Sequence, residues 1–403
     1  MTFRAARKIF AVSACGVLLG ITPTFVMAQH PPTPEQQKRI EQDKVVRHNG
    51  DQPKNPGPLA KDVQTATTPA AVENAMRKVA DWELKKDQPY FGDIWTWSVL
   101  YTGVMAAGES LREPRYIDTM NQVGQKFHWK LRSHLPNADD TSISQMYTEM
   151  YMLKREPEMI ANTREELDAL IAVENQPAAR IPWWWCDALY MAPPVWVRMY
   201  SITHERKYLI YVDREWWKTS DLLYDPQEHL YFRDATYLHK TEPNGRKMFW
   251  SRGNGWVMGG LVRTLEFMPK DDPMRQRYVE QFRQMAARVA SLQGADGLWR
   301  AGLLDPDYYV VPENSGSALF TYAFAWGVNH GVLDRKKYRP VAERAWAGLV
   351  KHIYADGRLG SMQQTGAAPA FYLPSASYNY GVGAFLLAGA EVKQMGTAAA
   401  HKP

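Results

Sequence analysis

The sequence predicts an all-α protein built from pairs of helices that can close into a ring. Three observations carry this prediction. Apolar side chains recur with helical spacing from about residue 68 onward, runs of strand-like alternation are scarce, and helix pairs recur about every 50 residues between 70 and 395. This rhythm fits roughly six hairpins, and the loops at their ends are where a functional site is expected.

The clearest helical pattern lies at residues 143–153. Five apolar side chains in this stretch are spaced to fall on one helix face: Ile143, Met146, Tyr147, Met150 and Tyr151. The same kind of pattern predicts helices in five further segments: 114–131, 163–173, 275–292, 339–353 and 382–395.

The N-terminus reads as a targeting segment. A basic stretch, an apolar run at 9–19 and the small-residue end at Ala28 predict a signal peptide over 1–28, cleaved after Ala28. The apolar run is too short to span a membrane. We therefore expect an exported protein, periplasmic or secreted.

The rest of the chain divides into three parts by composition. Residues 29–70 are rich in Pro, Gln, Lys and Asp and are expected to form a flexible lead-in. Residues 71–395 are expected to form the helical domain, and 396–403 a disordered tail.

Export changes the charge and cysteine balance. The full chain has 48 basic and 43 acidic residues, and losing residues 1–28 leaves 45 basic against 43 acidic, a net charge of +2. This balance, without a basic stripe, predicts no nucleic-acid partner. Cys186 is the only cysteine beyond residue 28, so no internal disulfide can form.

Aromatic residues are abundant, with 15 Trp and 21 Tyr. Exposed Trp and Tyr form flat amphipathic surfaces that suit sugar rings, whereas the alternative is a large aromatic core. The stretch WWWCDALYMAPP, residues 183–194, sets Asp187 directly behind three tryptophans. An apolar environment would raise the pKa of Asp187 and keep a proton available, although a loop hydrogen bond would equally explain the residue.

Two further stretches carry candidate residues. In NADDTSISQ, residues 137–145, Asp139 and Asp140 precede a helix, either as caps in a capping-box pattern or with one of them facing a cleft. In FWSRGNGWVMGGLVRTL, residues 249–265, glycines alternate with a cation, an amide and a flat ring. Those three residues are Arg252, Asn254 and Trp256.

Other chemistries lack their signatures. The chain contains no G-x-S-x-G, no H-E-x-x-H, no phosphate-binding G-x-x-x-x-G-K and no G-x-G-x-x-G after a strand. Its ten histidines show no metal-ligand spacing. We expect neither a metal nor a cofactor.

Together these motifs resemble glycoside hydrolase family 105 and its relatives in family 88, the unsaturated rhamnogalacturonyl and unsaturated glucuronyl hydrolases. The resemblance covers about residues 70–395. The segments that carry it are DDTSISQMY, CDALYMAPP, FWSRGNGWVMGGLVR, SGSALFTYAFAWGVNHG and VGAFLLAGAEV. It implies an (α/α)6 barrel that removes a 4,5-unsaturated galacturonyl or glucuronyl residue from the non-reducing end of lyase-generated oligosaccharides.

The resemblance also implies residue roles. Asp187 matches the chief acid, which would protonate C4 and then activate the water that attacks C5. Asp139 or Asp140 matches a second acid that steers the substrate or stabilises the cationic intermediate. Seven residues are candidates for substrate contact: Arg252, Asn254, Trp256, Trp185, Trp250, Arg233 and Trp95.

Two positions depart from the family pattern and bear on substrate preference. Ser144 stands where many relatives have Gly, and Arg233 lies near the position where some carry a pocket His. Two alternatives stay open: another (α/α)6 carbohydrate enzyme, such as a polysaccharide lyase or a sugar isomerase, and a non-catalytic envelope protein that binds sugar. The sequence leaves the oligomeric state open.

Overall fold

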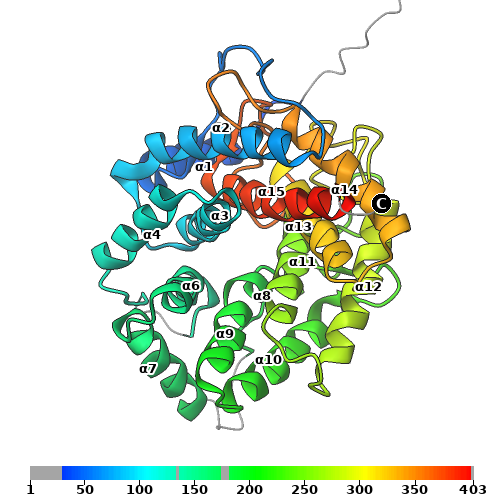
Figure 1. The fold of residues 1–403 in the computed structure, drawn as a ribbon. Helices are drawn as coiled ribbons and strands as arrows, with labels where there is room; N and C mark the ends of the chain where they lie inside the picture. Colours follow the sequence, from blue (N-terminus) through cyan, green and yellow to red (C-terminus); the bar gives the residue numbers. More distant parts are fainter. Residues whose placement is uncertain (1–29, 133–135, 174–180, 401–403) are drawn as a thin grey trace, which may run out of the picture.

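An inner ring of helices forms the centre of the molecule (Figure 1). The computed structural model describes residues 30–132, 136–173 and 181–400. The predicted signal peptide lies outside these residues. The ring consists of α3 (Trp95–Leu111), α6 (Ser144–Lys154), α8 (Ala188–Met191) with α9 (Pro193–Thr203), α11 (Ser251–Leu265), α13 (Asn314–Asn329) and α15 (Asn379–Ala400). Neighbours pack in this order, and α15 returns to α3.

A second layer of helices surrounds the ring. Five outer helices each follow an inner helix and pack against it: α4 (Pro114–Lys126), α7 (Glu158–Val173), α10 (Lys207–Leu223), α12 (Arg275–Ser291) and α14 (Arg335–Val350). The sixth outer helix is α2 (Pro69–Asp87), which packs against α15 from the other end of the chain. The predicted (α/α)6 barrel is confirmed, and its sixth hairpin joins the first and last helices of the barrel.

The two layers differ in burial, as their positions require. Every residue of α11 is buried, because this inner helix has neighbours on all sides. The outer helix α10 is amphipathic, with Tyr208, Val212 and Trp216 buried at helical spacing. Close packing at the α3–α15 seam needs glycine, since a Cβ at Gly103 would lie 2.3 Å from the carbonyl oxygen of Gly383.

Strands are few and short within the described residues. β1 (Gly50–Asp51) pairs with β4 (Ser377–Tyr378), antiparallel, with Gly50 opposite Tyr378. β2 (Tyr224–Asp225) pairs with β3 (Leu230–Tyr231), antiparallel, with Tyr224 opposite Tyr231. Both pairs join loops at the rim of the barrel.

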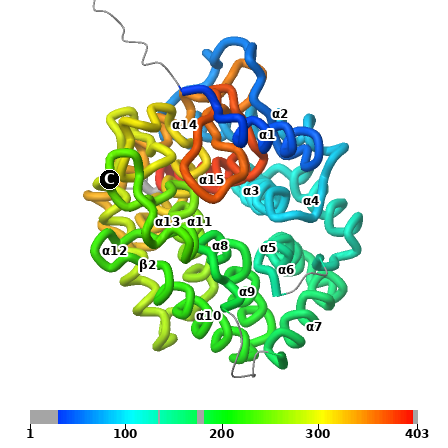
Figure 2. Tube along the Cα trace, turned by 180° about the vertical axis from the view of Figure 1, so that it is seen from behind, coloured from blue at the N-terminus to red at the C-terminus, as the bar shows by residue number. Residues whose placement is uncertain are grey.

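Residues 30–68, expected to be a flexible lead-in, carry ordered elements in the structure. Helix α1 (Pro34–Gln42) leads into a π-helical turn, η1 (Asp43–Arg47), and then into β1. Figure 2 shows this dark blue segment beside the orange loop that precedes α15. The Asp43 carboxylate accepts hydrogen bonds from Thr365 N at 3.2 Å and Thr365 Oγ1 at 2.6 Å. The composition of this segment did not predict these contacts, because the residues that the segment binds lie more than 300 positions away in the sequence. At the other end, α15 extends through the first residues of the predicted tail 396–403.

Candidate active site

Asp187 lies at the mouth of the barrel where the inner helices begin. Its neighbours fix the backbone, because Cys186 N–H donates to the Arg233 carbonyl at 2.8 Å and Trp185 pairs with Asp234. Asp187 is the N-cap residue of α8, but its side chain makes no capping hydrogen bond. Two prolines then begin α9, the next helix of the barrel. Asp187 therefore lies at the end of a hairpin.

The surroundings of Asp187 favour its protonated form. The residue is 9% exposed, and this burial raises the pKa of its carboxyl above the ordinary value. Arg233 acts in the opposite direction, with Nε 3.6 Å from Oδ2. The Cys186 thiol donates to the same oxygen at 3.4 Å. Arg233 Nε is itself buried, and its guanidinium also donates through Nη1 to Asp234 Oδ2 at 2.7 Å.

Asp139 is a second acid of the same mouth. It lies in the short helix α5 (Ala138–Thr141), whose cap is Asn137: the Asn137 side chain accepts from Asp139 N at 3.0 Å. The predicted capping box is absent, because the amide of Gln145 instead donates to the Tyr190 carbonyl at 2.8 Å. Burial, then the charge of Asp187, then that of Asp140 raise the pKa of Asp139 to about 7. At neutral pH this carboxyl is poised between its two protonation states.

Asp140 is distinguished from Asp139 by its partner. Its Oδ1 lies 3.3 Å from Arg132 Nε, and that guanidinium also binds Asp93 at 2.9 Å. Asp140 is thus engaged in an ion pair, whereas the pKa of Asp139 is raised to about 7, so Asp139 is the better candidate for proton chemistry.

Two cavities meet at Asp139. One, of about 520 Å³, extends toward α3 and the N-terminal segment and is also lined by Asp140, Trp95 and Tyr90. The other, of about 340 Å³, is lined by Trp184, Trp185 and Arg233. Asp187 lies behind Arg233, and its charge acts on Asp139. The two acids and an arginine thus share a mouth with aromatic walls.

The three consecutive tryptophans, residues 183–185, differ in exposure and in the residues they contact. Trp183 is buried and packs edge-on against Tyr211 at 5.8 Å. Trp185 is almost buried and lines the smaller cavity, whereas Trp184 is 39% exposed and contacts the Trp185 ring at 4.8 Å. Arg233 lies over the Trp184 ring at 5.6 Å. Trp184, which the sequence did not single out, is the most exposed of the three.

Arg252 occupies a buried structural position in α11. It is 0% exposed and donates to the carbonyls of Gln363 at 2.8 Å and Gln364 at 2.7 Å, with Glu313 at 3.8 Å. Trp250 lies 4.2 Å from this guanidinium and donates to Gln363 Oε1 at 3.0 Å. These bonds fasten the loop before α15 to the mouth. Direct contact of Arg252 or Trp250 with sugar is not supported by this burial.

Asn254 and Trp256 are likewise enclosed. Asn254 exchanges hydrogen bonds with the Tyr231 backbone, accepting at 2.7 Å and donating at 3.0 Å. Trp256 is buried between Tyr190 and Trp95, at ring distances of 4.9 and 6.0 Å. Their predicted sugar contact is not supported either, and they position the residues around them. Trp95 itself is half-buried and lines the larger cavity, as a binding residue should.

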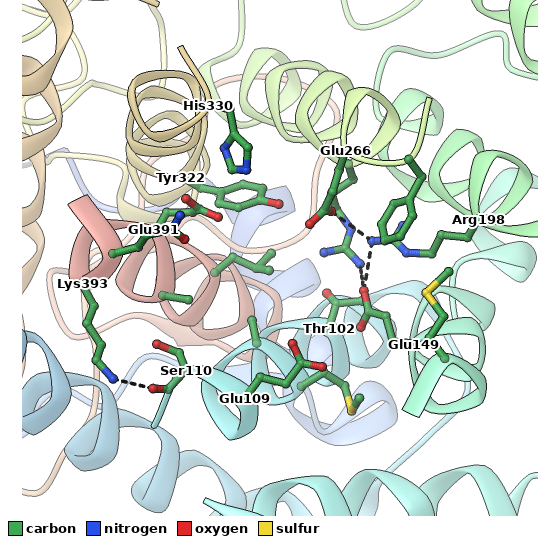
Figure 3. A pocket seen from close by; sticks show the side chains of 18 of the residues that line it. Thr102, Glu109, Ser110, Glu149, Arg198, Glu266, Tyr322, His330, Glu391 and Lys393 are labelled. Atoms are coloured by element: carbon green, nitrogen blue, oxygen red, sulfur yellow. Dashed lines mark hydrogen bonds and ion pairs between the residues drawn. The ribbon is translucent and has the colours of Figure 1, made fainter. Parts of the chain in front are cut away.

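The opposite mouth of the barrel, where the inner helices end, holds a larger cavity of about 700 Å³ (Figure 3). No predicted site residue lies there. Glu149 accepts from Arg198 at 3.1 Å and from Arg263, both buried. Burial raises the pKa of Glu391 to about 7. Glu149 and Glu266 pair with Arg198, whereas Glu391 accepts a hydrogen bond from Asn329 Nδ2 at 2.7 Å.

No group of three or more His, Cys, Asp or Glu residues is arranged to hold a metal ion among the residues the structure describes. Within the same residues, no helix combines the length and apolar character that crossing a bilayer requires.

Comparisons with known proteins agree with the helical barrel fold. The model of Glycosyl Hydrolase Family 88 matches residues 60–396. An unsaturated 3S-rhamnoglycuronyl hydrolase of Formosa agariphila is 38% identical over 344 residues, which cover 80% of this chain and 91% of that protein. A solved glycosyl hydrolase family 88 structure from Bacteroides vulgatus has 30% identity and a TM-score of 0.77, covering 81% of this chain and 99% of its own. Another, named a polysaccharide lyase, has 33% identity and a TM-score of 0.74, covering 80% and 96%.

Proposed function

The chain belongs to glycosyl hydrolase family 88, and from this we propose that it removes a 4,5-unsaturated uronic acid from an oligosaccharide that also contains rhamnose. The family predicted from the motifs is confirmed, and the chain is a glycoside hydrolase acting on unsaturated uronyl saccharides. The finer substrate assignment follows the name of the relative from Formosa agariphila.

The pairing of Asp187 with Asp139 at one aromatic mouth carries the proposed mechanism. Both carboxyls have a raised pKa, chiefly through burial. A vinyl ether is hydrated by an acid that first gives and then recovers a proton, so a carboxyl that is protonated near neutral pH suits the first step.

Asp187 donates its proton to C4 of the double bond, and positive charge develops at C5 and the ring oxygen. The resulting Asp187 carboxylate takes a proton from the water that attacks C5. The hemiketal so formed opens, and the hemiacetal left at C1 releases the remaining saccharide as an alcohol. The proton borrowed from Asp187 is thereby returned, and one water is consumed. This differs from ordinary glycosidases, in which two carboxylates act at the anomeric carbon.

The ionised Asp139 carboxylate stabilises the cationic intermediate. The uronate carboxylate of the substrate pairs with the guanidinium of Arg233, which lines the smaller cavity and whose side chain is 20% exposed. Trp184 and Trp185 provide the ring faces beside that arginine.

The proposal is tested by ultraviolet absorbance of the conjugated enol-uronate. The purified enzyme is given lyase-treated polysaccharides, including pectic, glycosaminoglycan, ulvan-type and arabinogalactan preparations. Absorbance should fall, fastest on products in which rhamnose follows the uronide. No fall on any product would contradict the hydrolase assignment, and a fall confined to rhamnose-free products would contradict the substrate class.

One structural relative is named a polysaccharide lyase, so lyase activity is the second candidate. A lyase creates the conjugated double bond, and incubation with intact polysaccharide would raise the same absorbance. The two activities therefore give opposite signs in one assay.

For location, we propose export to the periplasm or beyond the cell, on the strength of the predicted signal peptide. N-terminal sequencing of the mature protein should begin at Gln29. Recovery of the uncut chain from the cytoplasm alone would contradict the proposal.

A further inference from the structure

The N-terminal segment, residues 30–52, forms one wall of the larger cavity. Val46, Arg47 and His48 line it together with Tyr90 and Asp139. This wall comes from a part of the chain that precedes residues 60–396, the range matched by the family model. The segment therefore adds surface to the candidate active site that the shared barrel does not provide.

His48 and Tyr90 present a flat aromatic pair on this wall. Their ring centroids lie 4.4 Å apart with an interplanar angle of 7°. Tyr90 is 52% exposed, and His48 is exposed too. His48 has a φ of 51°, a left-handed conformation that a non-glycine residue seldom adopts. The pair keeps an open face beside the cavity at the expense of backbone strain.

Anchors on both sides hold this wall in place. Before it, Asp43 is hydrogen-bonded to Thr365 and forms an ion pair with Arg47, whose Nε lies 3.2 Å from Asp43 Oδ1. After it, Asn49 O accepts from Asn379 N at 2.8 Å, and β1 pairs with β4. A surface held in place on both sides loses little conformational freedom when a ligand binds, which favours affinity.

We propose that His48, Tyr90 and Arg47 form a saccharide-binding subsite of the active site. A pyranose ring of the substrate stacks on the His48–Tyr90 pair, and the partly exposed Arg47 guanidinium donates to oxygens of that ring. This inference rests on the proposed function. The ring belongs either to the unsaturated uronide or to the sugar that follows it, and the experiment separates the two.

The test compares two substrates of the full mature enzyme: an unsaturated disaccharide, and the methyl glycoside of the unsaturated uronide, which lacks the second ring. Tyr90→Ala and His48→Asn, the latter chosen because Asn tolerates a left-handed backbone, should each raise KM about tenfold with little change in kcat. Tyr90→Phe keeps the ring and should retain the wild-type KM. Arg47→Gln should raise KM by a similar factor.

The pattern across substrates assigns the ring. A rise in KM on the disaccharide alone identifies the following sugar, and a rise on both identifies the uronide. Tyr308→Ala is the matched control, since Tyr308 also stacks on a histidine of this segment, His30, at 5.7 Å but does not line the cavity.

Three results would overturn the subsite. They are an unchanged KM on both substrates, a loss of kcat at unchanged KM, and a KM rise matched by Tyr308→Ala together with a lower melting temperature. Failure of the proposed function looks different, because the wild-type enzyme would then lower the absorbance of neither substrate.

Discussion

The two mouths of the barrel both contain buried acids, but they use them differently. Where the inner helices begin, Asp139 lines two cavities with aromatic walls, and Asp187 lies 3.6 Å from the partly exposed Arg233. Where they end, Glu149 is held between two buried arginines. The cavity at the second mouth, of about 700 Å³, is bigger than either cavity at the first. A carboxyl with a pKa of about 7 occurs at each mouth, Asp139 at one and Glu391 at the other. Neither the size of a cavity nor a single raised pKa therefore identifies the active site. The candidate site is identified by two acids that lie close together beside exposed aromatic rings.

The largest expected effect is at Asp187. Asp187→Asn removes the proton donor and should lower kcat by about 10³-fold, within the range for loss of general acid–base catalysis. Loss of absorbance from an unsaturated disaccharide measures it. Glu391→Gln, at the opposite mouth, is the control and should leave kcat within about twofold. Full activity of Asp187→Asn would refute the mechanism.

Next comes Glu149, whose loss should affect stability and not chemistry. Glu149→Gln removes the carboxylate that pairs with both buried arginines and leaves Arg198 only Glu266 at 3.6 Å, which should cost about 3 kcal/mol of unfolding free energy. Urea unfolding measures this change, while kcat per folded molecule should stay at the wild-type value. A loss of kcat without a loss of stability would make the second mouth part of the active site.

Asp139→Asn should lower kcat by about 10²-fold, and more than Asp140→Asn does, because Asp140 is paired with Arg132. It should also raise the melting temperature at pH 8. The folded-state pKa of about 7 lies above the ordinary value of 3.8 for an aspartic acid, so the wild type loses stability as pH rises between these values. Asn carries no such charge. Melting curves at pH 4 and pH 8 test the sign: the gain should be small at pH 4, and a larger gain there would contradict it.

The smallest expected effect is at Trp184. Trp184→Ala removes the exposed ring beside Arg233 and should raise KM about tenfold with stability unchanged. Phe267→Ala is the counterpart at the opposite mouth, where the ring packs against Arg198 at 4.4 Å. It should leave KM unchanged, and equal effects of the two changes would remove the distinction between the mouths.

Much of the fold was predictable because helical periodicity is local. The outer helix α12 is an example, because its buried residues Tyr278, Phe282 and Met285 recur at helical spacing within the predicted segment 275–292. Inner helices vary: α6 carries the clearest helical spacing, at residues 143–153, whereas α11 has no exposed face. Helix α11 is buried on all sides, so nothing local could tell that Arg252 and Asn254 point to backbone carbonyls inside the protein.

The N-terminal segment marks the other limit of local reasoning. Its polar composition predicts flexibility, yet Asp43 and Gly50 find their partners at Thr365 and Tyr378. Such contacts between distant parts of the chain leave no periodic trace in the sequence. Because these contacts were not predicted, Arg47, His48 and Tyr90 were not among the candidate site residues.

The seam between α2 and α15 has a consequence for the order in which the molecule assembles. A Cβ at Gly396 would lie 2.3 Å from the carbonyl oxygen of Thr67, so positions more than 300 residues apart are in direct contact. Five hairpins can form from neighbouring helices as the chain emerges, whereas the ring closes only after the last helix has been made. Contacts of such long sequence separation form slowly. The open ring would expose apolar faces at its two free edges, where chaperones would be expected to bind until synthesis is complete.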